Sequence, residues 1–321
     1  MSVGDPNGIG PEIAVAAAAA EVSPAPVLVG DRQVIERWAR RAGLRTRQIH
    51  APTVAVPGVL DLLAVDAPPH ESRPGVISAE AGAATVAYLG AAVAGARAGI
   101  GRAIVAGPHS ETAINAAGIR FAGYPGLLAE LAGVPTDRVF LLLIGGGLAI
   151  VHATLHERLA DALHRLTPEL VITAATATAR FLGETTRIGH PARIGVCGIN
   201  PHAGEDGLFG HDDNRITAPA VAALRAAGIN ATGPLGADLL LAPERRAECD
   251  AFVAMYHDQG HIPVKLLAGR TASAVSVGAG LVFSSVGHGA AFDIAGRGVA
   301  DPTAMIKAIE LVSGAGLEVA R

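Results

Sequence analysis

Short apolar runs alternate with alanine-rich stretches along the whole chain. The apolar runs predict strands, and the alanine-rich stretches predict helices. The predicted strands cover residues 26–29, 103–106, 139–143, 170–173, 193–197, 239–241, 251–256 and 274–277. The predicted helices cover residues 10–20, 32–42, 81–98, 125–132, 155–166, 174–182, 217–227 and 301–312. This alternation is typical of an α/β protein in which helices cover a mostly parallel sheet.

The length of 321 residues allows one large domain or two lobes, and no period of about 20 to 50 residues indicates a repeat protein. Two lobes with a cleft between them fit this organisation best. The most apolar uncharged runs, 81–96 and 139–151, are shorter than the roughly 18 residues that a membrane span needs. The first residues lack a cationic region followed by an apolar one, so no secretory signal is expected. We therefore expect a soluble protein with no membrane partner.

The charge balance argues against a nucleic-acid partner. Lys and Arg number 25 against 29 Asp and Glu, a net charge of −4, and no basic block stands out. A small molecule is the expected partner. Cys197 and Cys249 are far apart and form no CxxC motif, so a disulfide framework is excluded and the cytoplasm is the expected compartment.

A glycine-rich turn opens the chain, with the sequence GDPNGIGPE at residues 4–12. Such a turn before a helix can present backbone N–H groups to an anion. It can equally be a tight turn that needs positive φ at its glycines. Its spacing differs from the GxGxxG motif of dinucleotide-binding folds, so the motif leaves both interpretations open.

Three histidines lie in polar, turn-like contexts: His156, His202 and His257. Each taken alone is more often a structural histidine than a ligand. His202 and His257 each follow a predicted strand, however, and side chains gather at the carboxyl edge of an α/β sheet. Three neutral imidazoles would suit a cation such as Zn²⁺ with an open position for substrate.

Two carboxylates and a lysine accompany these histidines. Asp238 and Asp258 could orient a metal-bound imidazole or balance its charge, and either could instead cap a helix. Lys265 lies among apolar residues, where a lysine either extends its amine to solvent or has a lowered pKa suited to proton transfer. Residues 284–302 form a glycine-punctuated segment whose length favours a ligand-binding loop over an ordinary connection.

Motifs along nearly the whole chain resemble the 4-hydroxythreonine-4-phosphate dehydrogenase family. They are GDPNGIGPEI, GPHSETAINAAGIRFAGYPGLLAEL, GINPHAGEDGLFG, GPLGADLLL, AMYHDQGHIPVKLL and HGAAFDIAGRGVADPTA. The resemblance implies an isocitrate and isopropylmalate dehydrogenase-like fold of two α/β lobes. It also implies a homodimer whose active sites lie in the lobe cleft and at the subunit interface.

The resemblance also implies a set of site residues. A divalent metal, Zn²⁺ before Mg²⁺, Mn²⁺ or Co²⁺, would be held by His156, His202 and His257. Asp238, Asp258 and Lys265 would be catalytic, with Lys265 also contacting substrate. NAD would bind the loop 287–302 through Gly287, His288, Gly289 and Asp293, the last favouring NAD over NADP by repelling a 2′-phosphate. The first lobe would comprise residues 1–117 with 265–321, and the second residues 118–264.

The chain departs from the phosphate-using members of the family at the substrate wall. It has Tyr124-Pro125, Ala274 and Phe283 where they typically carry His-Thr, Asn and Arg. A desolvated phosphate needs such donors, so an unphosphorylated and flatter substrate is expected. His109, Ser110 and Arg120 are candidates for binding a second carboxylate of the substrate.

These departures resemble the terephthalate cis-dihydrodiol dehydrogenase branch of the family, which converts 1,2-dihydroxy-3,5-cyclohexadiene-1,4-dicarboxylate to protocatechuate and CO₂. Two alternatives remain. The first is a dehydrogenase of 4-hydroxythreonine 4-phosphate or a related phosphorylated hydroxy acid. The second is a non-catalytic protein that binds metal or nucleotide.

Overall fold

The computed structural model describes residues 1–20, 22–66, 72–121, 123–185, 189–269 and 272–313. The described residues form two compact units, unit 1 from residues 1–127 with 281–313 and unit 2 from residues 128–280. The sequence predicted these boundaries after residues 117 and 264. The second boundary lies later because α12, His257–Ala268, packs against strands of unit 2, and β10, Ser273–Val277, pairs with one of them.

Unit 1 is built on parallel strands. The order β1-β3-β2 is parallel throughout, β4 pairs in parallel with β11, and Ser2 bridges to both Val29 and Ala106 and so joins β1 to β4. The strands are β1 Leu28–Gly30, β2 Arg45–Gln48, β3 Val59–Ala64, β4 Ala103–Ala106 and β11 Val282–Ser285. The helices are α1 Gly10–Ala19, α2 Arg32–Arg41, α3 Ala79–Arg97, α4 Glu111–Ala116, α5 Tyr124–Ala132, which crosses the boundary, and α13 Thr303–Ser313.

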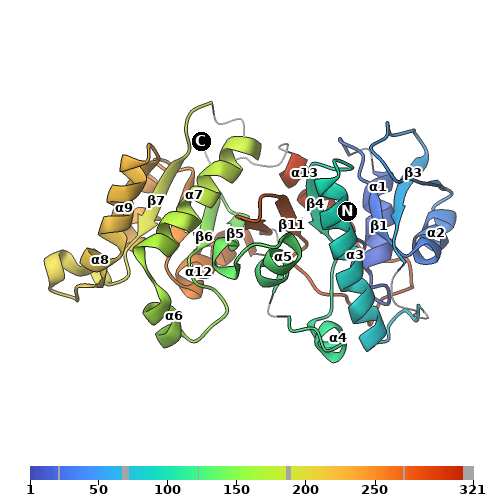
Figure 1. Ribbon diagram of the computed structural model, residues 1–321, viewed down its shortest axis with the longest axis horizontal. Helices are drawn as coiled ribbons and strands as arrows, with labels where there is room; N and C mark the ends of the chain where they lie inside the picture. The colour runs from blue at the N-terminus through green and yellow to red at the C-terminus, as the bar shows by residue number, and fades with distance from the viewer. Residues whose placement is uncertain (21, 67–71, 122, 186–188, 270–271, 314–321) are drawn as a thin grey trace. The chain divides into compact units, whose positions relative to one another are not determined.

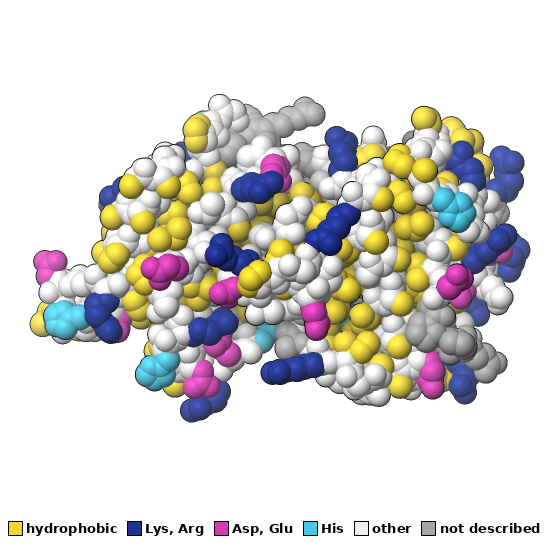
Figure 2. Space-filling model, in the orientation of Figure 1, with side chains coloured by type: hydrophobic (Ala, Val, Ile, Leu, Met, Phe, Trp, Pro, Cys, Tyr) yellow, Lys and Arg dark blue, Asp and Glu magenta, His cyan; other side chains and the backbone are white. Residues whose placement is uncertain are grey.

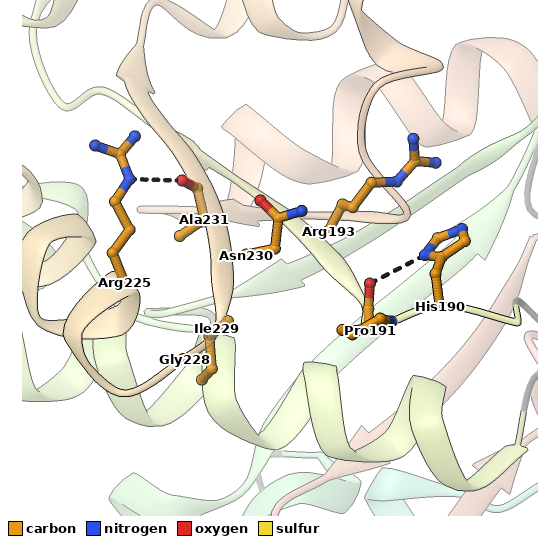
Figure 3. Close-up of a pocket in the computed structure, with 8 residues that line it drawn as sticks. All are labelled: His190, Pro191, Arg193, Arg225, Gly228, Ile229, Asn230 and Ala231. Carbon is orange, nitrogen blue, oxygen red and sulfur yellow. Dashed lines mark hydrogen bonds between the residues drawn. The ribbon is translucent and has the colours of Figure 1, made fainter.

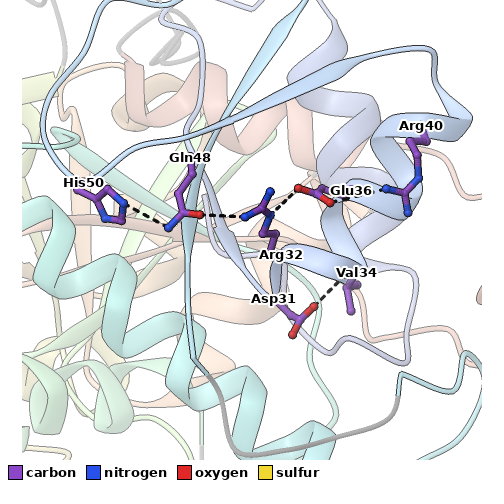
Figure 4. Close-up of polar contacts among 7 residues, drawn as sticks. All are labelled: Asp31, Arg32, Val34, Glu36, Arg40, Gln48 and His50. Atoms are coloured by element: carbon purple, nitrogen blue, oxygen red, sulfur yellow. Dashed lines mark hydrogen bonds and ion pairs between the residues drawn. The ribbon is translucent and has the colours of Figure 1, made fainter.

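The start of α2 shows how the sequence sets a helix boundary in unit 1. The Asp31 side chain accepts a hydrogen bond of 2.9 Å from Val34 N, which satisfies one of the N–H groups that a first turn leaves open. Glu36 then pairs with Arg32 at 2.6 Å and Arg40 at 3.6 Å, each four residues away on the same face (Figure 4). These exposed pairs support the helix only modestly.

Helix α3 is long and apolar enough to cross a membrane by length and composition, and it is the one such helix in the part of the chain that the structure describes. Half of its apolar window is nevertheless buried inside the protein, where it packs against β1, β4 and α4. Ser78 caps it by accepting a hydrogen bond from Ala81 N. It is therefore a core helix of unit 1.

Unit 2 contains a mixed sheet of order β10-β5-β6-β9-β7-β8. The pairs β5–β10 and β5–β6 are antiparallel, and the pairs β6–β9, β9–β7 and β7–β8 are parallel. Besides β10, its strands are β5 Phe140–Gly145, β6 Leu148–His152, β7 Arg193–Cys197, β8 Asn230–Leu235 and β9 Ala251–Ala254. Besides α12, its helices are η1 Thr136–Arg138, α6 Leu159–Arg165, α7 Pro168–Thr185, η2 Pro201–Gly207, α8 Asp212–Arg215, α9 Thr217–Ala226, α10 Ala237–Leu240 and α11 Pro243–Arg246 (Figure 1).

Two predicted strands are wrong. Residues 170–173 lie inside α7, whose buried positions Leu170, Val171, Ala174, Ala175 and Thr178 follow a helical period. Residues 239–241 lie in and just after the single-turn helix α10. In both cases a short apolar run fits a strand as well as a helix, and the residues on either side determine which of the two forms.

Candidate functional site

Four histidines of unit 2 gather at one edge of its sheet. Strands β6 and β9 are parallel, with His152 opposite Ala254, so their carboxyl ends meet there. His152 ends β6, His156 follows it, and α12 begins at His257 directly after β9. The ring centroids of His156 and His257 are 5.6 Å apart, and the rings of His257 and His261 stack at 3.8 Å with 10° between their planes.

Hydrogen bonds hold the buried part of this histidine group. His152 is 1% exposed, its Nδ1 lies 3.1 Å from Leu141 O, and its Nε2 lies 3.0 Å from His261 Nδ1. Burial lowers the pKa of His152 to about 3 and the pKa of His261 to about 4. Both imidazoles are therefore neutral near pH 7.

The first turn of α12 is tied to the neighbouring strands through Gln259. Its Oε1 accepts a hydrogen bond of 2.7 Å from Met255 N, and its Nε2 donates one of 2.7 Å to Gly198 O, just after β7. Asp258 Oδ1 lies 2.7 Å from His257 Nδ1. A carboxylate in this position holds the Nδ1–H tautomer and leaves the His257 Nε2 lone pair available, which is how metal-binding histidines are commonly oriented.

The third predicted metal ligand lies on a different element of unit 2. His202 is in η2, where its ring contacts that of Phe209 at 5.9 Å. The described residues contain no group of three or more His, Cys, Asp or Glu side chains arranged to hold a metal ion. The structure brings His156 and His257 together, and the complete triad with His202 stays a prediction.

The segment that carries His202 has an unusual backbone. Residues 202–206 all have positive φ, and four of them are not glycine. This left-handed turn is anchored at its entrance by Asp213, which is 1% exposed and accepts hydrogen bonds from Ile199 N at 2.8 Å and Asn200 N at 2.9 Å. Left-handed backbone is costly for residues with a Cβ and persists where the surroundings impose it.

The predicted catalytic residues lie on two helices of unit 2. Lys265 is exposed on α12, eight residues after His257, so these two residues and His261 share one face of the helix. Asp258 is also exposed, one residue after His257. Asp238 lies in the first turn of α10.

An aromatic group in unit 1 contains two of the predicted substrate-binding residues. Tyr124 lies 5.2 Å from Phe283, 4.6 Å from His109 and 5.8 Å from Phe121 between ring centroids. Tyr124 Oη donates a hydrogen bond of 2.9 Å to Gly107 O, and Phe283 is 1% exposed. Burial lowers the pKa of His109, so this group is uncharged.

The remaining candidates for substrate binding lie on several different elements. Ser110 caps α4, because its Oγ accepts a hydrogen bond of 3.1 Å from Ala113 N. Arg120 is exposed, and Pro125 is half-buried in the first turn of α5. Ala274 lies on β10 of unit 2 and is half-buried.

The glycine-rich turn at residues 4–12 contacts the predicted cofactor loop, and several of its N–H groups already have protein acceptors. Asp5 N donates to Pro108 O, Gly8 N to Asp5 O, and Ile9 N to Ala290 O at 2.9 Å. A Cβ at Gly8 would lie 2.7 Å from Ala290 Cβ, so only glycine allows this approach. Of its three glycines, Gly4 alone has positive φ, at 74°, whereas Gly8 is needed for the close approach to Ala290.

The loop 287–302 is seated on α1 and α2 as well. Glu12 of α1 accepts a hydrogen bond of 2.8 Å from Ala300 N, and Arg41 of α2 donates one of 3.2 Å to Gly296 O. The residues predicted to bind NAD face outward on this support, because all four are exposed: Gly287, His288, Gly289 and Asp293.

A separate cavity of about 490 Å³ lies at the opposite ends of β7 and β8 in unit 2 (Figure 3). Its cationic groups are already engaged: Arg193 pairs with Asp250 at 2.8 Å, and Arg225 Nε donates to Ala231 O at 2.8 Å. His190 also lines it, with its Nδ1 3.0 Å from Pro191 O. On the face shown in Figure 2, basic and acidic side chains are interspersed, with no patch of one sign.

Comparison with known proteins identifies the family to which the chain belongs. The family described as pyridoxal phosphate biosynthetic protein PdxA matches residues 23–312. The chain belongs to this family. The family and the α/β fold expected from the sequence are thereby confirmed.

Members of the PdxA family with different names resemble the chain. A 1,2-dihydroxy-3,5-cyclohexadiene-1,4-dicarboxylate dehydrogenase from Comamonas sp is 45% identical, over 97% of this chain and 96% of that protein. The crystal structure of a terephthalate 1,2-cis-dihydrodiol dehydrogenase from Burkholderia xenovorans is 54% identical, covers 98% of this chain and 96% of the other, and has a TM-score of 0.78. A 4-hydroxythreonine-4-phosphate dehydrogenase from Klebsiella pneumoniae is 36% identical, covers 98% of both chains, and has a TM-score of 0.84.

Proposed function

We propose that this PdxA-family chain is a cytoplasmic, metal- and NAD-dependent dehydrogenase that converts terephthalate cis-dihydrodiol to protocatechuate with release of CO₂. The observation that carries the proposal is the identity of 54% with a terephthalate dihydrodiol dehydrogenase, against 36% with a phosphate-using member at equal coverage of this chain. The two cysteines support a reducing compartment, because both are free thiols.

The aromatic group of unit 1 supports an unphosphorylated substrate. Its four rings are uncharged, and the hydroxyl of Tyr124 is already bound to Gly107 O. A phosphate dianion held out of water needs cationic or multiple N–H donors, which this group does not supply. Phe121 and Phe283 are buried, at 6% and 1% exposed, so the half-buried rings of Tyr124 and His109 are the aromatic surface that a flat apolar ring would contact.

The chemistry follows from the substrate. The dihydrodiol has a hydroxyl β to a carboxylate, so removal of its O–H proton and of the carbinol hydride gives a β-keto acid. Loss of CO₂ from that acid breaks the bond between the ring and the carboxyl carbon and leaves the electron pair in the ring, which becomes aromatic. NAD would accept the hydride, and a divalent cation would polarise the hydroxyl and carboxylate oxygens.

His156 and His257 fit a divalent cation. Both are imidazoles of the kind that Zn²⁺ and related metals prefer, and Asp258 holds the proton of His257 on Nδ1. Lys265, on the same helix face as His257, would take the hydroxyl proton on Nζ. Asp258 would keep His257 oriented, and Asp238 would assist the proton transfers.

We further propose a homodimer, because unit 2 leaves large apolar side chains exposed around its site helices. Ile262, Leu266 and Leu267 of α12 are 53%, 79% and 53% exposed. Leu208 and Phe209, beside His202, are 73% and 45% exposed. A second copy covering these side chains would remove them from water. His202 would then reach the site of the other subunit and supply the third imidazole.

The proposal is tested by following NADH and captured CO₂ with the terephthalate dihydrodiol as substrate. The protein is stripped of metal with EDTA and then reloaded with Zn²⁺, Mg²⁺, Mn²⁺ or Co²⁺. NADH and CO₂ should appear in equal amounts and only after reloading. His257→Ala should abolish both, whereas His164→Ala, at an exposed position of α6, should retain them. Binding of NAD and metal without any turnover would instead indicate a non-catalytic protein.

The second candidate function is oxidation of 4-hydroxythreonine 4-phosphate or a related phosphorylated hydroxy acid. It is favoured by the higher TM-score of the Klebsiella pneumoniae enzyme, 0.84 against 0.78. Turnover of 4-hydroxythreonine 4-phosphate at a higher kcat/KM than that of the dihydrodiol would establish it and overturn the first proposal.

A further inference from the structure

His261 lies against His257 but has no role in the proposed reaction. The two residues are four apart on α12, and their rings are nearly parallel, with centroids 3.8 Å apart and 10° between the planes. In-plane lone pairs of parallel rings do not converge on one point, so the stack does not make His261 a second ligand beside His257. The ring of His261 instead covers one face of His257.

The hydrogen bonds behind His261 fix its tautomer and its ring plane. Leu141 O can only accept, so His152 carries its proton on Nδ1 and presents a lone pair at Nε2. His261 must therefore donate from Nδ1 across the 3.0 Å contact to His152 Nε2. A ring held at Nδ1 by a 1%-exposed partner cannot turn freely about its side-chain bonds.

The close approach of α12 to β6 depends on Gly260. A Cβ at this position would lie 2.4 Å from His152 Nε2 and 2.9 Å from Ile150 Cγ2. Glycine costs about 1 kcal/mol relative to alanine in a helix interior. The helix thus carries a destabilising residue at the one point where it must pass over His152.

We propose that the His152–His261 hydrogen bond is a positioning element for His257. The His261 ring bounds one face of His257, and Asp258 holds its Nδ1 at 2.7 Å, so together they set the direction of the His257 Nε2 lone pair. The metal-binding part of this inference rests on the proposed function; the orientation of the His257 ring does not.

The test compares three side chains at position 152 in the full-length protein. His152→Phe keeps a flat ring but removes the acceptor for His261. His152→Gln restores both hydrogen bonds, because its oxygen can accept from His261 and its amide can donate to Leu141 O. His164→Phe, at the exposed position of α6, is the control.

The first measurement uses metal-free protein with ¹⁵N,¹³C-labelled histidine. His152 and His261 should show the Nδ1–H tautomer, and the His257 ring protons should carry the ring-current shift of the stack. His152→Phe should remove that shift, and His152→Gln and His164→Phe should keep it. An Nε2–H tautomer for His261, or His257 resonances that His152→Phe leaves unchanged, would overturn the proposal.

The second measurement is Co²⁺ affinity, followed by the visible absorption of the bound ion. We expect about a tenfold loss in His152→Phe and recovery in His152→Gln, as is common when a residue behind a metal ligand is changed. An equal affinity in all variants would overturn the positioning role. If the unchanged protein binds no Co²⁺, the proposed function fails, and the His257 resonances alone decide the positioning role.

If His152→Phe does not fold, His261→Gln replaces it in the Co²⁺ measurement. His261 is only half-buried, so its replacement is less disruptive than a change at His152. Loss of the His257 ring-current shift is then inevitable, so a Co²⁺ affinity lowered about tenfold supports the proposal, and an unchanged affinity contradicts it.

Discussion

The contact between Gly260 and His152 can be tested by adding a single methyl group. In Gly260→Ala the new Cβ would lie 2.4 Å from His152 Nε2 and 2.9 Å from Cδ2 of the same ring. Neither the ring nor Ile150, 2.9 Å away on the other side, is the flexible end of an exposed side chain, because both are at most 1% exposed. The helix or the ring must therefore move.

The expected magnitude is a difference between opposing effects. Alanine should gain about 1 kcal/mol over glycine in a helix interior. Overpacking a filled core costs roughly 1–3 kcal/mol. Displacing His152 also weakens its hydrogen bond to His261, worth about 1 kcal/mol. We expect the free energy of unfolding of unit 2 to fall by about 2 kcal/mol.

Urea unfolding followed by far-UV circular dichroism measures this change. Gly183→Ala is the matched control, because Gly183 lies inside α7 of the same unit and a Cβ there meets no atom within 4 Å. It should raise stability by about 0.5–1 kcal/mol. In a His152→Ala background, which makes room for the methyl group, Gly260→Ala should cost little or nothing. A Gly260→Ala protein as stable as Gly183→Ala would refute the close packing of α12 on β6.

Three further predictions follow from other features. Because burial lowers the pKa values of His152 and His261, the unfolded chain binds up to two more protons than the folded one between about pH 4 and pH 6.5. Stability of the metal-free protein should accordingly fall as the pH decreases below 6.5, and thermal unfolding across this range checks the sign. Glu12→Ala removes the acceptor of Ala300 N, so it should lower the free energy of unfolding by about 2 kcal/mol. The same change should raise KM for NAD more than it lowers kcat. Glu12→Gln keeps an acceptor oxygen and should preserve the stability and the KM. Ala203 has a left-handed backbone at φ 53°, which glycine adopts at lower cost. Ala203→Gly should therefore raise the free energy of unfolding in urea titrations by about 1 kcal/mol. A loss of stability would show that the backbone at residue 203 is not strained.

The sequence predicted the alternation of strands and helices well where a run was long or clearly bounded. The strand at 193–197 and the helix at 32–42 are found within a residue of their predicted ends, the latter because Asp31 caps it. The run at 170–173 failed because four apolar residues fit either period, and only the continuation through Ala174 and Ala175 favours the helix. Helix α12 was not predicted, since Gly260 and Pro263 lie inside it.

The candidate site was predicted in part. His156 and His257 stand out in sequence because polar residues follow apolar strands, and the structure brings them together. His152 and His261 were missed, since a histidine that ends a buried strand and one within a helix look structural by themselves. The four-residue spacing in HDQGH was the signal that could have pointed to a shared helix face. The burial of Phe283 could not be predicted, because it depends on tertiary packing, including the contact with Tyr124.

The division of the chain between the two units has a consequence during synthesis. The described part of unit 2 is one continuous segment, residues 128–280, so all of its strands are available once residue 280 has left the ribosome. Unit 1 is not: β11 pairs with β4, and Met305 and Ile309 of α13 complete a core that also contains Ile13 and Tyr88. The first 127 residues must therefore wait, with this apolar surface uncovered, until the last element has been translated. Shielding nascent chains from aggregation matters most for the half of the protein that is made first.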